Sequence, residues 1–289
     1  YLARLAPSSR RAMFSALGRI AQELTGQDAD PMSLPWHQLE YAHTIALRSR
    51  LAADLAPATA NRHLAALRGV LQEAWRLGIM DAEAYRRATD LKPVRGRRER
   101  TGREVTAAEA ATFLEACRGR GGVNGARDAA AFALLYGAGL RRAEVVAAER
   151  TDLDVQEGRL LVRGKGNKQR TIYLDRGSLQ ALQDWLAYRG DEPGPLIQGC
   201  TTNGKATGRR LTTTSLYRAL DRRRREAGIA PFTPHDLRRS YGGDLLDAGA
   251  DLATVSAMMG HADPATTAGY DRRGDRAKRK VATLRQLPY

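Results

Sequence analysis

A basic, turn-rich segment divides this chain into two parts. Residues 91–104 read LKPVRGRRERTGRE, with Pro93, Gly96 and Gly102 among a dense set of arginines and no apolar periodicity. This composition is typical of a linker, and its charge suits a segment that lies along a phosphate backbone. The chain has 289 residues, which is long for one compact domain. We therefore expect one domain over residues 1–90, a basic linker over residues 91–104 and a second domain over residues 105–289.

The first 90 residues carry the apolar spacing of helices. Helices are expected over residues 8–24 and 39–55, and a third should run from Pro57 to a stop at Gly78. Proline suits the first turn of a helix, and glycine is the usual residue just beyond its end. No strand pattern interrupts this region, so a small helical bundle is the natural outcome.

The second part combines helices with one β-hairpin. Thr106, with Glu109 three residues later, predicts a capping box at the start of a helix that ends near Cys117. Strands over residues 159–163 and 169–174 flank a Gly-Lys-Gly-Asn sequence that provides hairpin turn chemistry. The predicted fold class is mainly α with a small antiparallel β-sheet. Further helices are expected over residues 126–136, 176–188, 212–227, 234–248, 252–259, 264–268 and 276–284.

Positive charge is spread along the whole chain. Lys and Arg number 47 against 32 acidic residues, a formal net charge of +15. Residues 1–100 hold 16 basic and 10 acidic residues, and the remainder holds 31 and 22. A polyanion that contacts both parts, DNA or RNA above all, would explain this distribution. A charge that only maintains solubility is the simpler alternative.

Several protein classes fit the sequence poorly. Cys117 and Cys200 form no CxxC motif, which favours a reducing, cytosolic compartment. The five histidines stand apart and form no ligand-spaced cluster with Cys or Asp, so no metal and no other cofactor is expected. No apolar run is long enough to span a bilayer, and the first 20 residues lack the pattern of a secretory signal.

Residue types suited to a metal-free attack on a phosphodiester are concentrated in the second part. Negative charge builds on the nonbridging oxygens during such an attack, and the planar fork of arginine binds them best. The leaving oxygen needs a proton, which Lys or His supplies, and the nucleophile needs a hydroxyl and a proton acceptor. The residues that cover these tasks are Arg141, Lys165, His235, Arg238, His261 and Tyr270. His235 and Arg238 lie three residues apart and would share one face of a helix.

These residues lie in segments that resemble the tyrosine recombinase (phage integrase) family, which includes Xer-type and mobile-element integrases. The matching segments are GLRRAE, GKGNKQR and TPHDLRRSYGGDLLDAGADLATVSAMMGHADPATTAGY. The order Arg, Lys, His-x-x-Arg, His, Tyr and its spacings match the family across the second part. LAPATANRHLAALRGVL in the first part resembles, more weakly, the family's helical (SAM-like) core-binding domain. The resemblance implies a two-domain clamp that closes around duplex DNA.

The resemblance assigns phosphate binding to the arginines. Arg141 and Arg238 would hold the scissile phosphate, and His261 would donate to a nonbridging oxygen. Glu144 would orient Arg141 without taking part in the chemistry. The register of the G-L-R and H-x-x-R motifs selects these two arginines over the neighbouring Arg142 and Arg239.

The resemblance also assigns the nucleophile and the proton transfers. Tyr270 would attack the phosphodiester and form a covalent 3′-phosphotyrosyl link, which conserves bond energy and makes ATP and metal unnecessary. Lys165 would protonate the leaving 5′ oxygen from the tip of the hairpin. His235 would accept the Tyr270 proton or hydrogen-bond the phosphate. Taken singly, each of these side chains has an ordinary packing or surface explanation, but together they match in order and spacing.

Other basic residues are weaker candidates for DNA contact. Arg62 and Arg68 lie on the helix that begins at Pro57, and Lys168 and Arg170 lie on the second hairpin strand. A structural or solvated role is an equal alternative for each of them. The run of arginines over residues 222–225 either touches phosphates or is a solvated charge run.

The implied partners are a double-stranded DNA recombination site and further copies of the chain. A homo-tetramer would hold two sites, with a dimer on each site and a Holliday junction between the two strand exchanges. An accessory directionality factor is a possible partner, and the activity would be cytoplasmic and nucleoid-associated. The alternatives are a monomeric type IB topoisomerase that relaxes supercoils and a DNA-binding regulator that does not cut. The identity of the DNA site is not legible, because a few groove contacts and DNA deformability set it.

Overall fold

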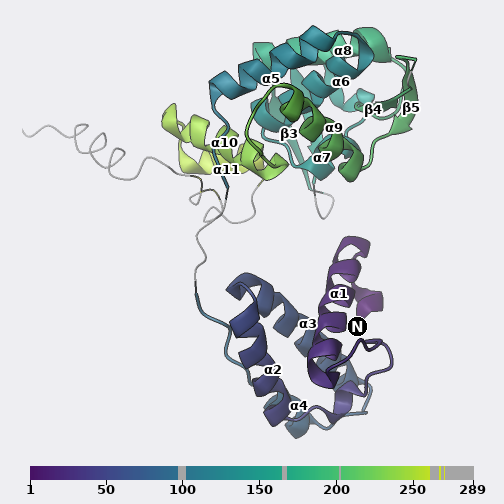
Figure 1. Ribbon diagram of the computed structural model, residues 1–289, viewed down its shortest axis with the longest axis vertical. Coiled ribbons are helices and arrows are strands. Elements are labelled where there is room, and N and C mark those ends of the chain that lie inside the picture. Colours follow the sequence, from purple (N-terminus) through teal and green to yellow (C-terminus); the bar gives the residue numbers. More distant parts are fainter. Residues whose placement is uncertain (97–101, 165–167, 202, 261–266, 268–269, 271–289) are drawn as a thin grey trace, which may run out of the picture. The chain divides into compact units, whose positions relative to one another are not determined.

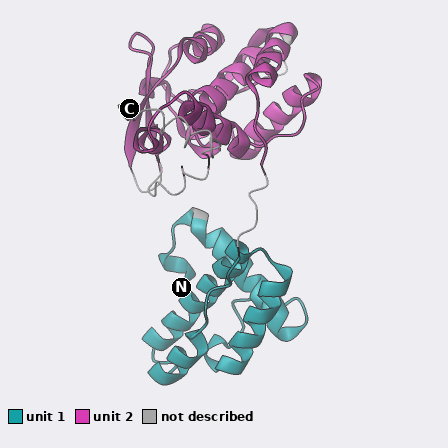
Figure 2. Ribbon diagram, turned by 90° about the vertical axis from the view of Figure 1, so that its left-hand side faces the viewer, with its two compact units in different colours: residues 1–100 teal, residues 101–289 magenta. Residues whose placement is uncertain are grey.

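The computed structural model consists of two compact units, Tyr1–Arg100 and Thr101–Tyr289, drawn in different colours in Figure 2. It describes residues 1–96, 102–164, 168–201, 203–260, 267 and 270. The division falls within the basic segment 91–104. Each unit has its own buried apolar core, as expected of a domain.

Unit 1 is a helical bundle. Its apolar faces meet in a core that includes Leu47, Leu64 and Leu67. The three helices predicted for this region are confirmed, and a fourth that the sequence pattern does not predict follows them. The elements are η1 (Leu2–Arg4), α1 (Pro7–Thr25), η2 (Trp36–Gln38), α2 (Tyr41–Asp54), α3 (Pro57–Arg76) and α4 (Ala82–Thr89), where η1 and η2 are 3₁₀ turns.

Unit 2 is mainly helical, which confirms the predicted fold class. Its first elements are α5 (Ala107–Arg120), α6 (Gly122–Phe132), the π-helix η3 (Ala133–Gly137), α7 (Arg142–Ala147) and the 3₁₀ turn η4 (Arg150–Asp152). They are followed by β1 (Leu153–Asp154), β2 (Arg159–Arg163), β3 (Gln169–Tyr173), α8 (Arg176–Arg189), β4 (Gln198–Cys200) and β5 (Ala206–Arg210). The last described helices are α9 (Thr213–Glu226), α10 (Pro234–Asp247) and α11 (Leu252–Met259).

Two antiparallel sheets lie at the side of these helices. The order β1-β2-β3 contains the predicted hairpin, with Leu160 of β2 opposite Ile172 of β3. The second sheet, β4-β5, is not predicted from the sequence. Helix α6 packs against both α5 and α8, and all three contribute to the core of unit 2 (Figure 1). Phe113 of α5 and Phe132 of α6 stack there with ring centroids 4.2 Å apart.

The backbone between η3 and Arg141 passes close to α10. The helix expected over residues 126–136 begins earlier, at Gly122, and its last turn widens into the π-helix η3. Gly139 then adopts a left-handed conformation with φ of 63°, which glycine tolerates best. A Cβ atom at this position would also overlap the ring of Tyr241 in α10. Glycine is therefore required for this close approach, which places Arg141 beside α10.

The arginine run over residues 222–225 is only partly a solvated charge run, because Arg222 and Arg225 are exposed whereas Arg223 is buried. Arg223 is 1% exposed and forms ion pairs with Asp128 of α6 and with Glu226. Arg224 and Arg225 both pair with Asp221 one helical turn away. A run of four arginines in the sequence therefore gives no sign that one of them, Arg223, is buried.

Some expected features lie outside the described residues. They are the tip of the hairpin at residues 165–167, most of the helix expected over residues 264–268 and the helix expected over residues 276–284. Within the part of the chain that the structure describes, no helix combines the length and apolar character needed to cross a bilayer.

Candidate active site

Arg141 and Glu144 fix each other at the start of α7. Glu144 accepts a hydrogen bond from the Arg141 backbone nitrogen at 2.8 Å and another from Arg141 Nη1 at 2.9 Å. The carboxylate therefore satisfies a backbone donor at the helix start and holds the guanidinium at the same time. Arg141 Nη2 also donates to the carbonyl oxygen of Gly260, at 3.1 Å. These contacts support the expected role of Glu144 in orienting Arg141.

Glu144 has a second arginine partner, Arg170 on β3. Arg170 Nη1 donates to Glu144 Oε1 at 3.0 Å, and Nη2 donates to Oε2 at 2.9 Å. Glu144 is only 6% exposed. Burial by itself would raise the pKa of this carboxyl, but the hydrogen bonds from Arg170 and from the Arg141 backbone outweigh burial and bring the pKa down to about 2. Glu144 is thus an anion shared by two arginines at any physiological pH.

Acid should destabilise unit 2 through Glu144. A carboxylate whose pKa is lowered by folding stabilises the folded state above its unfolded-state pKa, and this contribution is lost as the pH falls through the folded value. The window runs from the ordinary pKa of 4.5 down to about 2, and the shift corresponds to about 3 kcal/mol. We expect the free energy of unfolding, measured by urea titration at several pH values, to fall less steeply across this window in Glu144→Gln. Equal slopes for the two proteins would contradict this expectation.

Arg238 lies on α10, about one helical turn after His235. The helix begins with a capping box between Thr233 and Asp236. Because His235 and Arg238 both lie in this helix, three residues apart, their expected shared face is confirmed. Arg238 is 3% exposed and donates to the carbonyl oxygens of Gly139 and Met259. Burial, and then the nearby charge of Arg141, lower the pKa of Arg238 to about 10, so it stays cationic at neutral pH.

A pocket of about 390 Å³ opens above these arginines. Both Arg141 and Arg238 line it, and so does His235. Four further residues line it that the sequence analysis does not single out for the site: Arg142, Tyr217 of α9, Thr233 and Pro234. Tyr217 has no motif and comes from a helix that the family motifs do not include, so only the fold reveals it. A pocket lined by three arginines and an imidazole is suited to bind a phosphate.

The ring of Tyr270 lies near that of His235. The two ring centroids are 6.0 Å apart, with the planes inclined by 64° in an edge-on arrangement. Tyr270 is 2% exposed and belongs to an apolar cluster with Tyr241, Val255 and Met259. A Cβ atom on Gly242, a buried glycine of α10, would lie 3.2 Å from Tyr270 Cδ2, so the glycine leaves room for this ring. The structure therefore brings the expected nucleophile beside the expected proton acceptor.

Of the six remaining predicted residues, the structure describes four. Lys165 and His261 lie outside the described residues, so their expected roles stay predictions. Arg62 and Lys168 are exposed, as a DNA-contacting side chain must be. Arg68 donates to the carbonyl oxygen of Leu91, which ties the segment after α4 to α3. Arg170, as shown above, is bound to Glu144.

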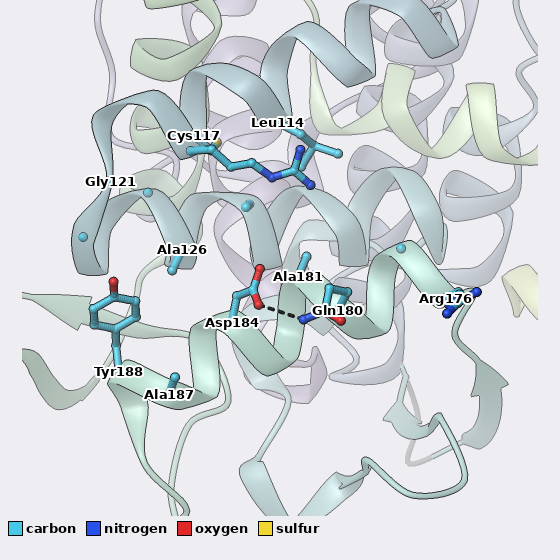
Figure 3. A pocket seen from close by; sticks show the side chains of 15 residues that line it. Leu114, Cys117, Gly121, Ala126, Arg176, Gln180, Ala181, Asp184, Ala187 and Tyr188 are labelled. Atoms are coloured by element: carbon cyan, nitrogen blue, oxygen red, sulfur yellow. Dashed lines mark hydrogen bonds between the residues drawn. The ribbon is translucent and has the colours of Figure 1, made fainter.

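A larger hollow, of about 740 Å³, lies away from this site between α5, α6 and α8 (Figure 3). Small residues such as Gly121, Ala126 and Ala181 line much of it. Asp184 at its edge accepts a hydrogen bond from Gln180 at 2.9 Å. None of the predicted catalytic residues lines it, so size alone does not identify the active site of this protein.

The described part of the site supplies several of the groups that phosphoryl transfer needs. Arg141 and Arg238 supply fixed positive charge for a transition state that gains negative charge on oxygen. Tyr270 supplies a hydroxyl, and His235 beside it can take the proton. Among the residues that the structure describes, no three His, Cys, Asp or Glu side chains cluster in a way that would hold a metal ion.

Comparison with known proteins gives the same picture. The model of the phage integrase family matches residues 103–276. Tyrosine recombinase XerD of Mycobacterium leprae is 34% identical over 229 residues, which cover 75% of this chain and 70% of that protein. Tyrosine recombinase XerC of Alcanivorax borkumensis is 39% identical over 148 residues, which cover 50% of this chain and 47% of that protein. The chain thus spans about half the length of several of the curated relatives that it matches.

Solved structures show the same fold. XerH site-specific recombinase bound to palindromic difH substrate, in a post-cleavage complex, superposes with a TM-score of 0.70 at 20% identity and covers 94% of this chain and 79% of its own. A lambda integrase tetramer bound to a Holliday junction superposes with a TM-score of 0.65 at 16% identity and covers 99% of this chain and 75% of its own. At these identities the likeness concerns the fold.

Proposed function

The chain belongs to the phage integrase family, and from this premise we propose that it is a site-specific recombinase that cleaves and rejoins DNA strands through Tyr270. The observation that carries the proposal is the pocket that Arg141, Arg238 and His235 line, with the ring of Tyr270 6.0 Å from that of His235. Such a pocket offers a clamp for one phosphate and a hydroxyl next to a base.

In the proposed reaction, Tyr270 Oη attacks the scissile phosphorus and the bond from phosphorus to the 5′ oxygen breaks. His235 accepts the phenol proton, and Lys165, assigned by its motif, gives a proton to the leaving 5′ oxygen. Arg141 and Arg238 hold the nonbridging oxygens, and His261 assists them. The 3′-phosphotyrosyl link keeps the bond energy, and attack on it by a 5′ hydroxyl rejoins a strand without ATP.

The proposed assembly is a tetramer on two DNA sites, with a dimer on each site. Each chain would close its two units around duplex DNA, because basic residues outnumber acidic ones in both parts of the sequence. The related tetramer of lambda integrase is bound to a Holliday junction, and we propose the same intermediate for this chain. We place the activity on DNA in the cytoplasm, in association with the nucleoid and with an accessory directionality factor.

The proposal is tested with DNA that the protein itself selects. Duplexes bound from a random pool are enriched, and the winning sequence is placed twice in one plasmid. We expect recombination between the two copies and no relaxation of a plasmid that lacks them. Relaxation of any supercoiled plasmid by the monomer would instead identify a type IB topoisomerase activity. Tight binding with neither reaction would identify a regulator that does not cut.

A further inference from the structure

Three arginine side chains cover the C-terminal end of α11. The last carbonyl groups of a helix have no partner within the helix, and cations interact favourably with this negative end. The three consecutive carbonyl oxygens of residues 258–260 each accept from a different guanidinium. Arg170 Nε donates to the first at 2.9 Å, Arg238 Nη2 to the second, and Arg141 Nη2 to the third at 3.1 Å. Two of these arginines line the phosphate pocket, and Arg170 does not.

Arg170 is connected to Arg141 along two separate paths. The first passes through Glu144, whose two carboxylate oxygens accept from Arg170 and whose Oε1 also accepts from Arg141. The second passes through the end of α11, where Arg170 and Arg141 bind oxygens two residues apart. Gly260 makes this second path tight, because a Cβ atom there would lie 3.1 Å from Arg170 Cζ.

The side chain of Arg170 is directed into the protein. All three of its guanidinium nitrogens donate to protein oxygens, and only 14% of the side chain is exposed. The side chain of Arg141, by comparison, is 43% exposed and lines the pocket. An arginine whose fork is already committed to a carboxylate and a carbonyl is suited to hold its neighbours in place.

We propose that Arg170 is a positioning residue for strand cleavage, which holds Arg141 in the geometry that the scissile phosphate requires. It acts through Glu144 and through the end of α11, and it does not touch the reacting atoms. This inference rests on the proposed function. It replaces direct DNA contact, the role that the sequence suggests for Arg170, with an indirect one.

The test measures single-turnover formation of the covalent adduct on two nicked suicide duplexes of the selected sequence. One carries the ordinary scissile phosphodiester, and the other carries a methylphosphonate, in which a neutral methyl group replaces one charged oxygen. We expect Arg170→Met to slow adduct formation on the phosphodiester by about 100-fold, because a clamp displaced by about 1 Å loses its alignment. On the methylphosphonate the loss should shrink to less than about tenfold, because the clamp has less charge to neutralise.

Two further variants keep the result interpretable. Arg170→Lys retains a cation beside Glu144 and should fold even where Arg170→Met does not, but its ammonium cannot bind both carboxylate oxygens and the Met258 oxygen at once. It should show the same pattern with a smaller loss. The matched control is Arg159→Met on β2, which breaks an ion pair with Asp154 in the same sheet away from the pocket and should leave both rates unchanged.

Each outcome decides the point. Equal fractional losses on the two duplexes would show a merely structural role for Arg170 and overturn the inference. A wild-type rate in both Arg170 variants would overturn it as well, and would leave the proposed function standing. Absence of any adduct with the wild-type protein would instead count against the proposed function and, with it, the basis of the inference.

Discussion

Tyr270→Phe is expected to abolish the covalent protein–DNA adduct, a loss of at least about 10⁴-fold, because the substitution removes the oxygen that attacks the phosphorus. DNA affinity should stay close to that of the wild-type protein. The phenylalanine ring fills the same space in the cluster with Tyr241, Val255 and Met259, so the fold should be preserved. Loss of chemistry with retained binding is the combination that separates a nucleophile from a structural tyrosine.

The measurement is adduct formation on a nicked suicide duplex, resolved by denaturing electrophoresis, with binding followed in parallel by gel shift. Tyr241→Phe is the matched control, because Tyr241 is a buried tyrosine of the same apolar cluster. It should form adduct. Adduct of normal yield from Tyr270→Phe would show that another residue attacks the DNA and would refute the assignment.

Asp128→Ala should destabilise unit 2 by about 3–5 kcal/mol, because it leaves a buried guanidinium without its anion. Asp128 is 1% exposed and accepts from Arg127 at 2.7 Å and from Arg223 at 3.0 Å. Both arginines are themselves buried, and Arg223 also pairs with Glu226, at 2.7 Å. Removal of the carboxylate therefore takes away the anion that pairs with Arg127 and one of the two anions that pair with Arg223, in an interior where solvation cannot compensate.

Urea denaturation followed by tryptophan fluorescence measures this effect, because Trp185 is buried in the core of unit 2. Asp184→Ala is the control, since Asp184 is exposed on α8 and accepts a hydrogen bond from Gln180 one helical turn away. It should change the free energy of unfolding by less than about 0.5 kcal/mol. A similar small change in Asp128→Ala would mean that the arginines find other partners.

Local patterns predict the long elements of this fold well. Apolar spacing identifies α1, α2 and α3, and the capping box of Thr106 and Glu109 locates the start of α5. Some short elements escape because they depend on single contacts, although the eight-residue α11 is predicted at its observed bounds. Helix α4 has eight residues and begins where the Asp81 carboxylate accepts from two backbone nitrogens. Strands β4 and β5 pair across a loop with an irregular register, which leaves no alternating pattern to read.

The active site shows the same division between local and distant information. Spacing alone predicts that His235 and Arg238 share a helix face, and the structure agrees. The bond between Arg170 and Glu144 joins residues 26 positions apart, and the bonds from Arg170 to Met258 and from Arg141 to Gly260 span 88 and 119 positions. Such contacts arise from the packing of β3, α7 and α11, so no motif encodes them. For the same reason, the burial of Arg223 is invisible in a run of four arginines.

The burial of Tyr270 has a consequence for the choice of DNA. Tyr270 is 2% exposed, so a phosphate reaches its hydroxyl only in molecules that expose it, and only those molecules are competent to cleave. The observed rate is then the product of this competent fraction and the intrinsic rate. A DNA site that binds the conformation with the exposed hydroxyl more tightly raises the competent fraction. The increase is set by the ratio of the site's affinities for the two conformations. Two sequences bound equally tightly can thus be cut at very different speeds, and discrimination is exercised after binding.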